Sequence, residues 1–150
     1  MKEEIKRIKG VVDVPYDWAY GKVIGEFFRN LKDKKITGSV CKKCRKVFVP
    51  PQVLCGVCFS DVEDELTIVA DTGYVETYTI LDYAFPGQIF EPPYAVGIIK
   101  LIGTNTRLNH IINKESLQKL SIGSKVRAVW KEEEEREGSF FDIKYFEVVE

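Results

Sequence analysis

Four cysteines that fall within 18 residues constrain this chain more than any other feature of its sequence. They form two CxxC pairs, CKKC and CGVC, separated by ten residues: Cys41, Cys44, Cys55 and Cys58. Each CxxC turn holds two sulfurs on one side of a tight loop, and a hairpin between two such turns brings all four sulfurs together as a tetrahedral cage. The spacing therefore predicts a metal site in a rubredoxin-like zinc ribbon, with Zn²⁺ expected and iron as the alternative.

The predicted metal has a structural role. Four protein thiolates fill a tetrahedral site and leave no open position for water or substrate. The competing interpretations are two disulfides or four unconnected core cysteines, and the reducing interior of a cell disfavours the disulfides. Because the segment around the cysteines has few large apolar residues, we expect metal binding to supply much of its folding free energy.

Length and composition predict a soluble, cytoplasmic protein. The chain has 150 residues, of which 45% are hydrophobic, so it can bury a substantial core. Its longest apolar stretch, Tyr94–Ile99, is far shorter than the roughly 20 residues that a membrane span needs. The first ten residues carry charges throughout, unlike a secretory signal. The Lys- and Glu-rich composition also resembles that of thermophilic proteins.

One helix is expected before the cysteines. Apolar residues recur at steps of three and four from Asp17 to about Lys34, and Asp17 is the predicted N-cap. Gly21 and Gly25 lie one turn apart within this stretch. Each glycine costs about 1 kcal/mol of helix propensity. The two glycines therefore indicate either that another backbone segment or a ligand approaches the helix closely, or that the helix is broken into two short ones.

After the cysteines the apolar period changes to the alternation of β-strands, with short turns between the runs. A helical segment is expected at Lys114–Leu120. The expected strands are Leu66–Ala70, Gly73–Tyr83, Tyr94–Ile102, Thr106–Ile112, Lys125–Glu132 and Ser139–Val149. Five or six antiparallel strands with a helix after the third barrel strand are typical of an OB-fold. The predicted fold is therefore mainly β with N-terminal helices: a helical segment at 1–36, a zinc ribbon at 37–62 and an OB-fold barrel at 63–150.

Catalytic motifs are missing from the sequence. His110 is the one histidine, and neither GxGxxG nor GxxxxGK[ST] occurs. With every cysteine assigned to the metal, a nucleophilic triad has only His110 to depend on, and such a histidine is more often a surface or satisfied core residue. The acidic run Glu132–Glu135 is expected at a solvated hairpin tip. We therefore expect no catalytic residues and no independent enzyme activity.

The charge distribution bears on nucleic-acid binding, which is the general use of a zinc ribbon joined to an OB-fold. Residues 1–60 carry 13 Lys and Arg against 6 Asp and Glu, whereas residues 61–150 carry 9 against 17. The acidic barrel half repels phosphate, and single-strand binding needs a basic groove with exposed aromatic rings. Nucleic-acid binding through the basic ribbon is therefore the second hypothesis.

The order of motifs resembles a known family. After the CxxC pairs come Gly73-Tyr74-Val75, Pro93-Tyr94 and Ile122-Gly123, and the similarity runs from about Tyr16 to the end. This series resembles the archaeal and bacterial zinc-ribbon and OB-fold family first catalogued as a domain of unknown function and linked to acyl-CoA metabolism. One departure is that Arg45 follows the first cysteine pair, where such ribbons often carry glycine.

The resemblance implies a non-catalytic, acyl-CoA-binding scaffold that associates with a thiolase and, in archaea, with a hydroxymethylglutaryl-CoA synthase. On this basis the N-terminal helix is the candidate CoA site. Phe27 and Phe28 are its expected apolar wall, and the cations expected near phosphate are Lys22, Arg29 and Lys32. The competing interpretation is that both phenylalanines belong to the core and the cations face solvent.

Overall fold

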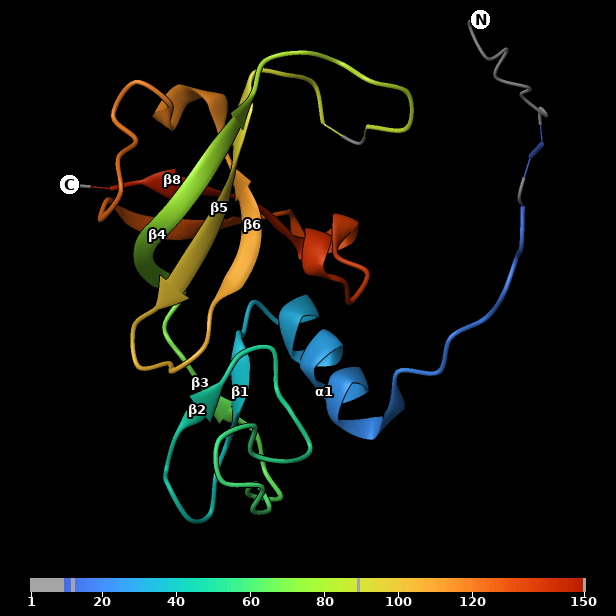
Figure 1. Cartoon of the computed structure of the whole chain (residues 1–150), viewed down its shortest axis with the longest axis vertical. Coiled ribbons are helices and arrows are strands. Elements are labelled where there is room, and N and C mark those ends of the chain that lie inside the picture. The colour runs from blue at the N-terminus through green and yellow to red at the C-terminus, as the bar shows by residue number, and fades with distance from the viewer. Residues whose placement is uncertain (1–9, 12, 89, 150) are drawn as a thin grey trace, which may run out of the picture.

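The structure is a computed structural model that describes residues 10–11, 13–88 and 90–149. Residues 1–9, which begin the predicted N-terminal helical segment, lie outside the described residues. A β-barrel and a smaller three-stranded sheet are stacked along the long axis, and helix α1 lies beside the small sheet (Figure 1). Within the described part, no helix combines the length and the apolar character that crossing a membrane would require.

The closed barrel has the strand order β4-β5-β6-β8-β7, and β7 pairs with β4 to complete it. All its pairs are antiparallel except β6 with β8, which are parallel where Ile112 faces Phe146. Its strands are β4 (Thr72–Leu81), β5 (Tyr94–Leu101), β6 (Leu108–Ile112), β7 (Lys125–Trp130) and β8 (Ile143–Val148). This five-stranded barrel confirms the predicted OB-fold.

The barrel strands form where apolar and polar residues alternate. In β7, Val126 and Ala128 are buried, while Lys125 and Arg127 face solvent. A strand places successive side chains on opposite faces, so this pattern fills the barrel interior on one side and hydrates the other. One apolar core joins the barrel to the preceding segment, because Phe27, Leu31 and Ile36 belong to the same cluster as the barrel residues.

The small sheet has the order β2-β1-β3, formed by β1 (Thr37–Val40), β2 (Val47–Phe48) and β3 (Thr67–Ile68). Its third strand therefore comes from beyond residue 62, the predicted end of the ribbon. The β5–β6 loop attaches this sheet to the barrel: the Val47 N–H donates to Asn105 Oδ1 at 2.9 Å, and the Val49 N–H donates to Thr106 Oγ1 at 2.7 Å.

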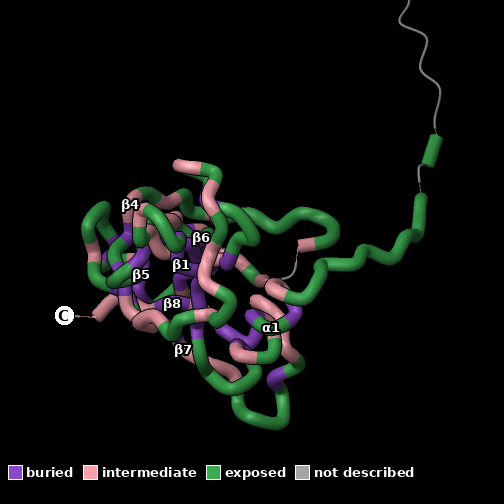
Figure 2. The backbone as a smooth tube through the Cα atoms, turned by 90° about the horizontal axis from the view of Figure 1, so that it is seen from below, coloured by how far each residue is buried: buried purple, intermediate pink, exposed green. Residues whose placement is uncertain are grey.

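Helix α1 (Gly21–Lys32) begins later than the sequence pattern predicts. Gly21 has φ +74°, a left-handed conformation through which a right-handed helix does not continue. The predicted N-cap Asp17 is therefore wrong, and the N-cap position belongs to Tyr20. Gly25 marks a close approach, because a Cβ there would lie 3.2 Å from the Tyr20 ring. Residues 13–20 run as exposed, extended chain away from the body (Figure 2).

Two further elements are shorter than predicted. The helical segment expected at Lys114–Leu120 is limited to the 3₁₀ turn η1 (Lys114–Ser116). The last expected strand does not begin at Ser139, since a 3₁₀ turn, η3 (Phe140–Asp142), precedes β8. Ser139 and Asp142 form a capping box around η3, and these side-chain bonds to the backbone replace strand pairing. A third turn, η2 (Glu133–Glu135), carries the acidic run on the β7–β8 connection.

Candidate metal centre

Each CxxC pair lies on a tight turn, and the two turns repeat the same hydrogen bonds. In the first, the Arg45 N–H donates to the Cys41 carbonyl at 3.1 Å; in the second, the Phe59 N–H donates to the Cys55 carbonyl at 3.0 Å. The first cysteine of each pair is also bonded through its own N–H, at 2.9 Å for Cys41 and 3.0 Å for Cys55. Because the two turns share this backbone geometry, their two pairs of sulfurs face each other.

The four sulfurs form one cluster, with all Sγ atoms within 4.8 Å of one another. The Sγ atoms of Cys41 and Cys58 are 3.5 Å apart, and those of Cys44 and Cys55 are 3.6 Å apart. A tetrahedron with metal–sulfur bonds of about 2.3 Å has edges of about 3.8 Å. The four cysteines are not linked as disulfides. The cluster therefore has the size and donor set of a four-thiolate metal-binding site.

Backbone amides point at the sulfurs, as thiolate ligands require. The N–H groups of Cys44 and Lys43 donate to Cys41 Sγ at 3.3 and 3.4 Å, and the Val57 N–H donates to Cys55 Sγ at 3.4 Å. The bond from Cys44, with that from Lys43, lowers the pKa of the Cys41 thiol. These amides stabilise negative charge on sulfur before any metal arrives.

The pKa values of Cys58 and Cys44 are shifted in opposite directions. Ser60, through its hydroxyl and its N–H, lowers the pKa of Cys58 to about 6. The Lys46 N–H lowers the pKa of Cys44, but burial and the neighbouring thiols outweigh it and raise that pKa to about 11. Four thiolates cannot all be charged this close together without compensation, and a divalent metal ion supplies it.

The residue after each cysteine pair has a left-handed backbone. Arg45 has φ 58° and Phe59 has φ 56°, the conformation that favours glycine. The absence of glycine after the first pair therefore leaves the turn intact, with Arg45 in the strained position. Its guanidinium is held by Glu63 at 2.5 Å. Phe59 is 82% exposed, and no packing of its ring accounts for its presence there.

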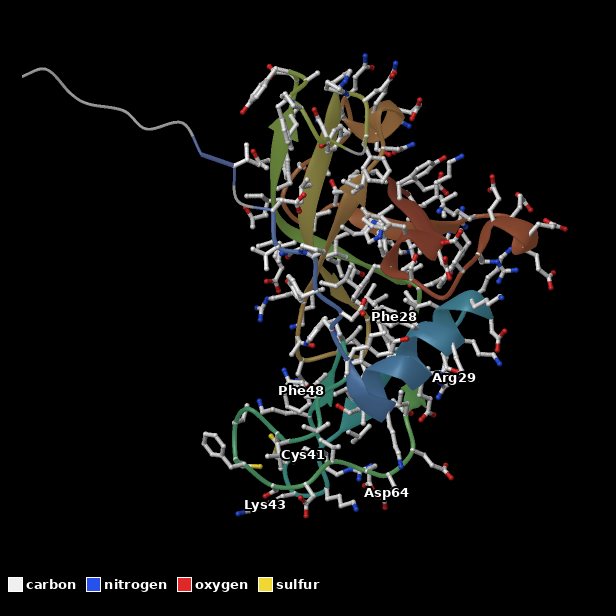
Figure 3. The ribbon with its side chains drawn as sticks, turned by 90° about the vertical axis from the view of Figure 1, so that its right-hand side faces the viewer. Phe28, Arg29, Cys41, Lys43, Phe48 and Asp64 are labelled. Atoms are coloured by element: carbon white, nitrogen blue, oxygen red, sulfur yellow. The ribbon has the colours of Figure 1, made fainter. Side chains whose placement is uncertain are left out.

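The site is closed, with Cys41 and Cys55 fully buried and Phe48 packed against them. The cysteines lie on the turns next to the small sheet, and Figure 3 shows Cys41 at the end of the molecule away from the barrel. Four sulfur donors and a buried position fit a structural metal and leave no coordination position for a reacting group.

The proposed CoA residues lie on α1 and divide between core and surface. Phe27 is 1% exposed and belongs to the barrel core. Phe28 is half-buried between α1 and the barrel, with its ring 5.7 Å from that of Phe140 (Figure 3). The cations Lys22, Arg29 and Lys32 are exposed. Arg29 and Lys32 lie in the last turn, where positive charge favours the helix.

His110 is a core residue. It is 6% exposed, and its Nε2–H donates to the Phe140 carbonyl at 3.1 Å. Burial lowers its pKa, so the ring is neutral in the folded protein. The ring stands 5.5 Å from that of Phe146. Nothing around it among the described residues forms a nucleophile–base pair.

Sequence patterns missed an aromatic cluster beside η3. Phe140 and Phe141 were assigned to a strand, yet they form a turn whose rings meet Phe27, Phe28 and Phe90. The signal that could have found this turn is the Gly138-Ser139 pair with Asp142 three residues after the serine, the pattern of a capped turn.

Two family models match the chain. One, described as the rubredoxin-like zinc ribbon domain of ChsH2, matches residues 30–64, and the other, described as the C-terminal OB-fold domain of ChsH2, matches residues 67–131. Together they span most of the described fold.

Two solved structures are similar to this chain over most of its length. One is described as an Ltp2-ChsH2(DUF35) aldolase; the match has 26% sequence identity and a TM-score of 0.63 and covers 80% of this chain and 92% of that chain. The other is a protein of unknown function from the DUF35 family of Sulfolobus solfataricus, with 28% identity and a TM-score of 0.61, covering 73% of this chain and 78% of that chain.

Proposed function

Since the chain belongs to the family of ChsH2 zinc-ribbon and OB-fold proteins, we propose that it is a non-catalytic accessory subunit of an enzyme of acyl-CoA metabolism. One observation carries the proposal: the chain matches 92% of a ChsH2 chain that is described together with an aldolase, Ltp2. The two family models match both the ribbon and the barrel, so the similarity concerns the two-part fold and not a common module alone.

The site chemistry supports an accessory role. The metal centre has four sulfur donors and no open position, and the one histidine is buried and neutral. Zn²⁺ is the proposed metal, held by Cys41, Cys44, Cys55 and Cys58, because thiolates in a tetrahedron suit it. Its contribution is to crosslink two turns of a sheet that is otherwise small. The reaction then belongs to the partner enzyme.

The finer proposal follows from the family resemblance: the partner is a thiolase, joined in archaea by a hydroxymethylglutaryl-CoA synthase. The N-terminal half carries the positive charge suited to the phosphates of CoA. In this proposal Lys22, Arg29 and Lys32 contact those phosphates. Phe28 is the half-buried aromatic beside them, whereas Phe27 lies too deep in the core to touch a ligand.

A pull-down tests the accessory role. The tagged chain is captured from extract of its own source organism, and retained proteins are identified by mass spectrometry. We expect a thiolase-type or aldolase-type enzyme in stoichiometric amount, and no turnover of acyl-CoA by the isolated chain. Turnover by the chain alone would contradict the proposal. So would retention of RNA or single-stranded DNA that falls steeply with salt, which is the behaviour of a nucleic-acid-binding protein.

A charge reversal tests the α1 cations. Arg29→Glu with Lys32→Glu should weaken binding of coenzyme A to the assembled complex. The matched control is Lys114→Glu with Lys125→Glu, which makes the same charge change at two exposed positions on the barrel. Equal affinity in the two double variants would remove α1 from the CoA site.

A further inference from the structure

An exposed aromatic segment precedes α1. Residues 13–20 leave the start of the helix as extended chain and run away from the body of the molecule (Figure 1). Its large side chains are exposed to water: Val14 at 69%, Tyr16 at 82%, Trp18 at 77% and Tyr20 at 51%. We call residues 13–20 the N-terminal arm. Covering one aromatic ring removes about 150–250 Å² of surface from water, so an arm with three such rings can form a substantial interface.

The N-terminal arm has the alternation of a β-strand. Its large apolar residues occupy every second position, and the positions between them hold Asp13, Pro15, Asp17 and Ala19. In an extended chain, side chains two residues apart lie on the same face. The arm therefore presents one face of large, mainly aromatic side chains and one face of acidic and small ones. This pattern is typical of a strand that buries one of its faces.

The root of the N-terminal arm is held against the fold. The Tyr20 ring packs edge-on against Phe28 at 5.4 Å, and a Cβ on Gly25 would lie 3.2 Å from it. Tyr20 also lines a mainly apolar hollow of about 470 Å³, which Val23 of α1 and Val53 of the ribbon share. Because Tyr20 belongs to both features, one apolar surface continues from the arm onto the ribbon.

The charges of the N-terminal arm indicate the class of its partner. The arm contains two carboxylates, Asp13 and Asp17, and neither lysine nor arginine. Segments that bind nucleic acids or anionic lipid surfaces place cations beside their aromatic residues. The arm therefore suits a protein surface that has an apolar groove for the aromatic face and cations near the two carboxylates.

A second copy of this chain is a poor receptor for such a strand. Strand addition needs an open sheet edge along the added segment. The barrel closes on itself and so has no edge strand, and the small sheet ends in β2 and β3, which have two residues each. Among the described strands, therefore, no long edge strand is available, and the receptor is a different protein.

From these features we propose that the N-terminal arm docks this subunit to its partner enzyme by adding a strand to an open sheet edge of that enzyme. Tyr16 and Trp18 are the anchors, since they are the most exposed rings of the arm. The proposal rests on the proposed function for the identity of the partner as an enzyme of acyl-CoA metabolism. The arm precedes residues 30–64 and 67–131, which the two family models match, so it is an addition to the ribbon and the barrel.

Pro15 determines which edge of the arm pairs with the enzyme. Proline has no N–H to donate, so in a strand its position faces away from the paired neighbour. Residues two apart in a strand direct their N–H groups to the same side. Pairing therefore uses the N–H groups of Tyr16 and Trp18, whereas the N–H of Asp17 faces away.

The affinity of the chain for its enzyme tests the proposal. The enzyme that co-purifies with the tagged chain is isolated, and its binding to the metal-loaded chain is measured by biolayer interferometry. Tyr16→Ser with Trp18→Ser should weaken binding at least about thirtyfold, because a buried aromatic anchor commonly contributes tenfold or more. Asp17→Pro should bind within about threefold of the wild type, because it removes an N–H that does not pair.

The matched control is Ile102→Ser with Ile122→Ser, which removes two apolar side chains that are 44% and 71% exposed on the barrel. This variant should bind within twofold of the wild type. Because the N-terminal arm lies outside the core, the arm variants should keep the circular dichroism spectrum and the metal content of the wild type. A weaker affinity in them then reports docking and not folding.

Three results would overturn the proposal. They are unchanged affinity in the Tyr16 and Trp18 variant, a loss above tenfold in Asp17→Pro, and a dimer of the purified chain that the Tyr16 and Trp18 variant abolishes. The last result would assign the arm to a second copy.

The proposed function is judged separately. If the wild type and the Tyr16 and Trp18 variant capture an acyl-CoA enzyme equally well, the arm proposal fails and the accessory role stands. If the wild-type chain captures no such enzyme, the accessory role fails, and the arm proposal that rests on it fails with it.

Discussion

Replacing Asp142 should destabilise the protein, because its buried carboxylate holds a turn on the β7–β8 connection. Its carboxylate is 0% exposed and accepts hydrogen bonds from the N–H groups of Glu137, Gly138 and Ser139 at 3.0, 2.7 and 3.2 Å. The Ser139 hydroxyl donates as well, at 3.4 Å. These bonds hold the turn that carries Phe140 and Phe141.

The cost of Asp142→Ala can be worked from those donors. A buried donor left without a partner costs about 1–3 kcal/mol. Gly138 and Ser139 are half-buried, whereas Glu137 is exposed and its N–H can turn to water. Two orphaned donors at about 1.5 kcal/mol each give a loss of about 3 kcal/mol in the free energy of unfolding.

Urea denaturation with excess metal, followed by circular dichroism, measures the loss. Asp64→Ala is the matched control, because Asp64 is 95% exposed and forms a surface ion pair with Lys42, an arrangement worth less than about 1 kcal/mol. A loss below 1 kcal/mol for Asp142→Ala, or equal losses in the two variants, would refute the reasoning that this carboxylate organises the turn.

Three further outcomes are expected. Burial lowers the pKa of His110 below its ordinary value of 6.5. As pH falls, the unfolded chain therefore takes up the proton before the folded chain does, and the free energy of unfolding should decrease below about pH 6.5. The variant His110→Gln should show a flatter dependence of the urea midpoint on pH in that range, and parallel profiles for the two proteins would contradict this. Gly73→Ala should destabilise the barrel by at least about 2 kcal/mol, because a Cβ would collide with the Lys100 carbonyl. A melting temperature equal to that of the wild type would show that β4 and β5 can move apart without loss of stability. Phe59→Gly should raise stability by about 1 kcal/mol, because it relieves a left-handed φ of 56°; a lower denaturation midpoint would argue against strain at that turn.

The metal cluster could be predicted from the sequence because it depends on local geometry. A CxxC turn fixes its two sulfurs whatever surrounds it, and the ten residues between the pairs are enough for a hairpin. The barrel could be predicted for a similar reason, since alternation over β4, β5 and β7 reports directly which side faces the core.

The start of α1 and the η3 turn could not be predicted in the same way. Apolar spacing continues through Asp17, but the left-handed Gly21 interrupts the helix, and spacing carries no information on φ. Phe140 and Phe141 have the composition of a strand, and only the hydrogen bonds of Asp142 turn the chain there.

Native mass spectrometry of the chain, isolated from its own source under non-dissociating conditions, tests the central claim most directly. That claim is that a closed four-thiolate metal centre supports a subunit that serves another enzyme. The account predicts one zinc per chain, within an assembly that also holds an enzyme acting on acyl thioesters. Detection of a metal-free monomer whose four thiols are all reactive would contradict it.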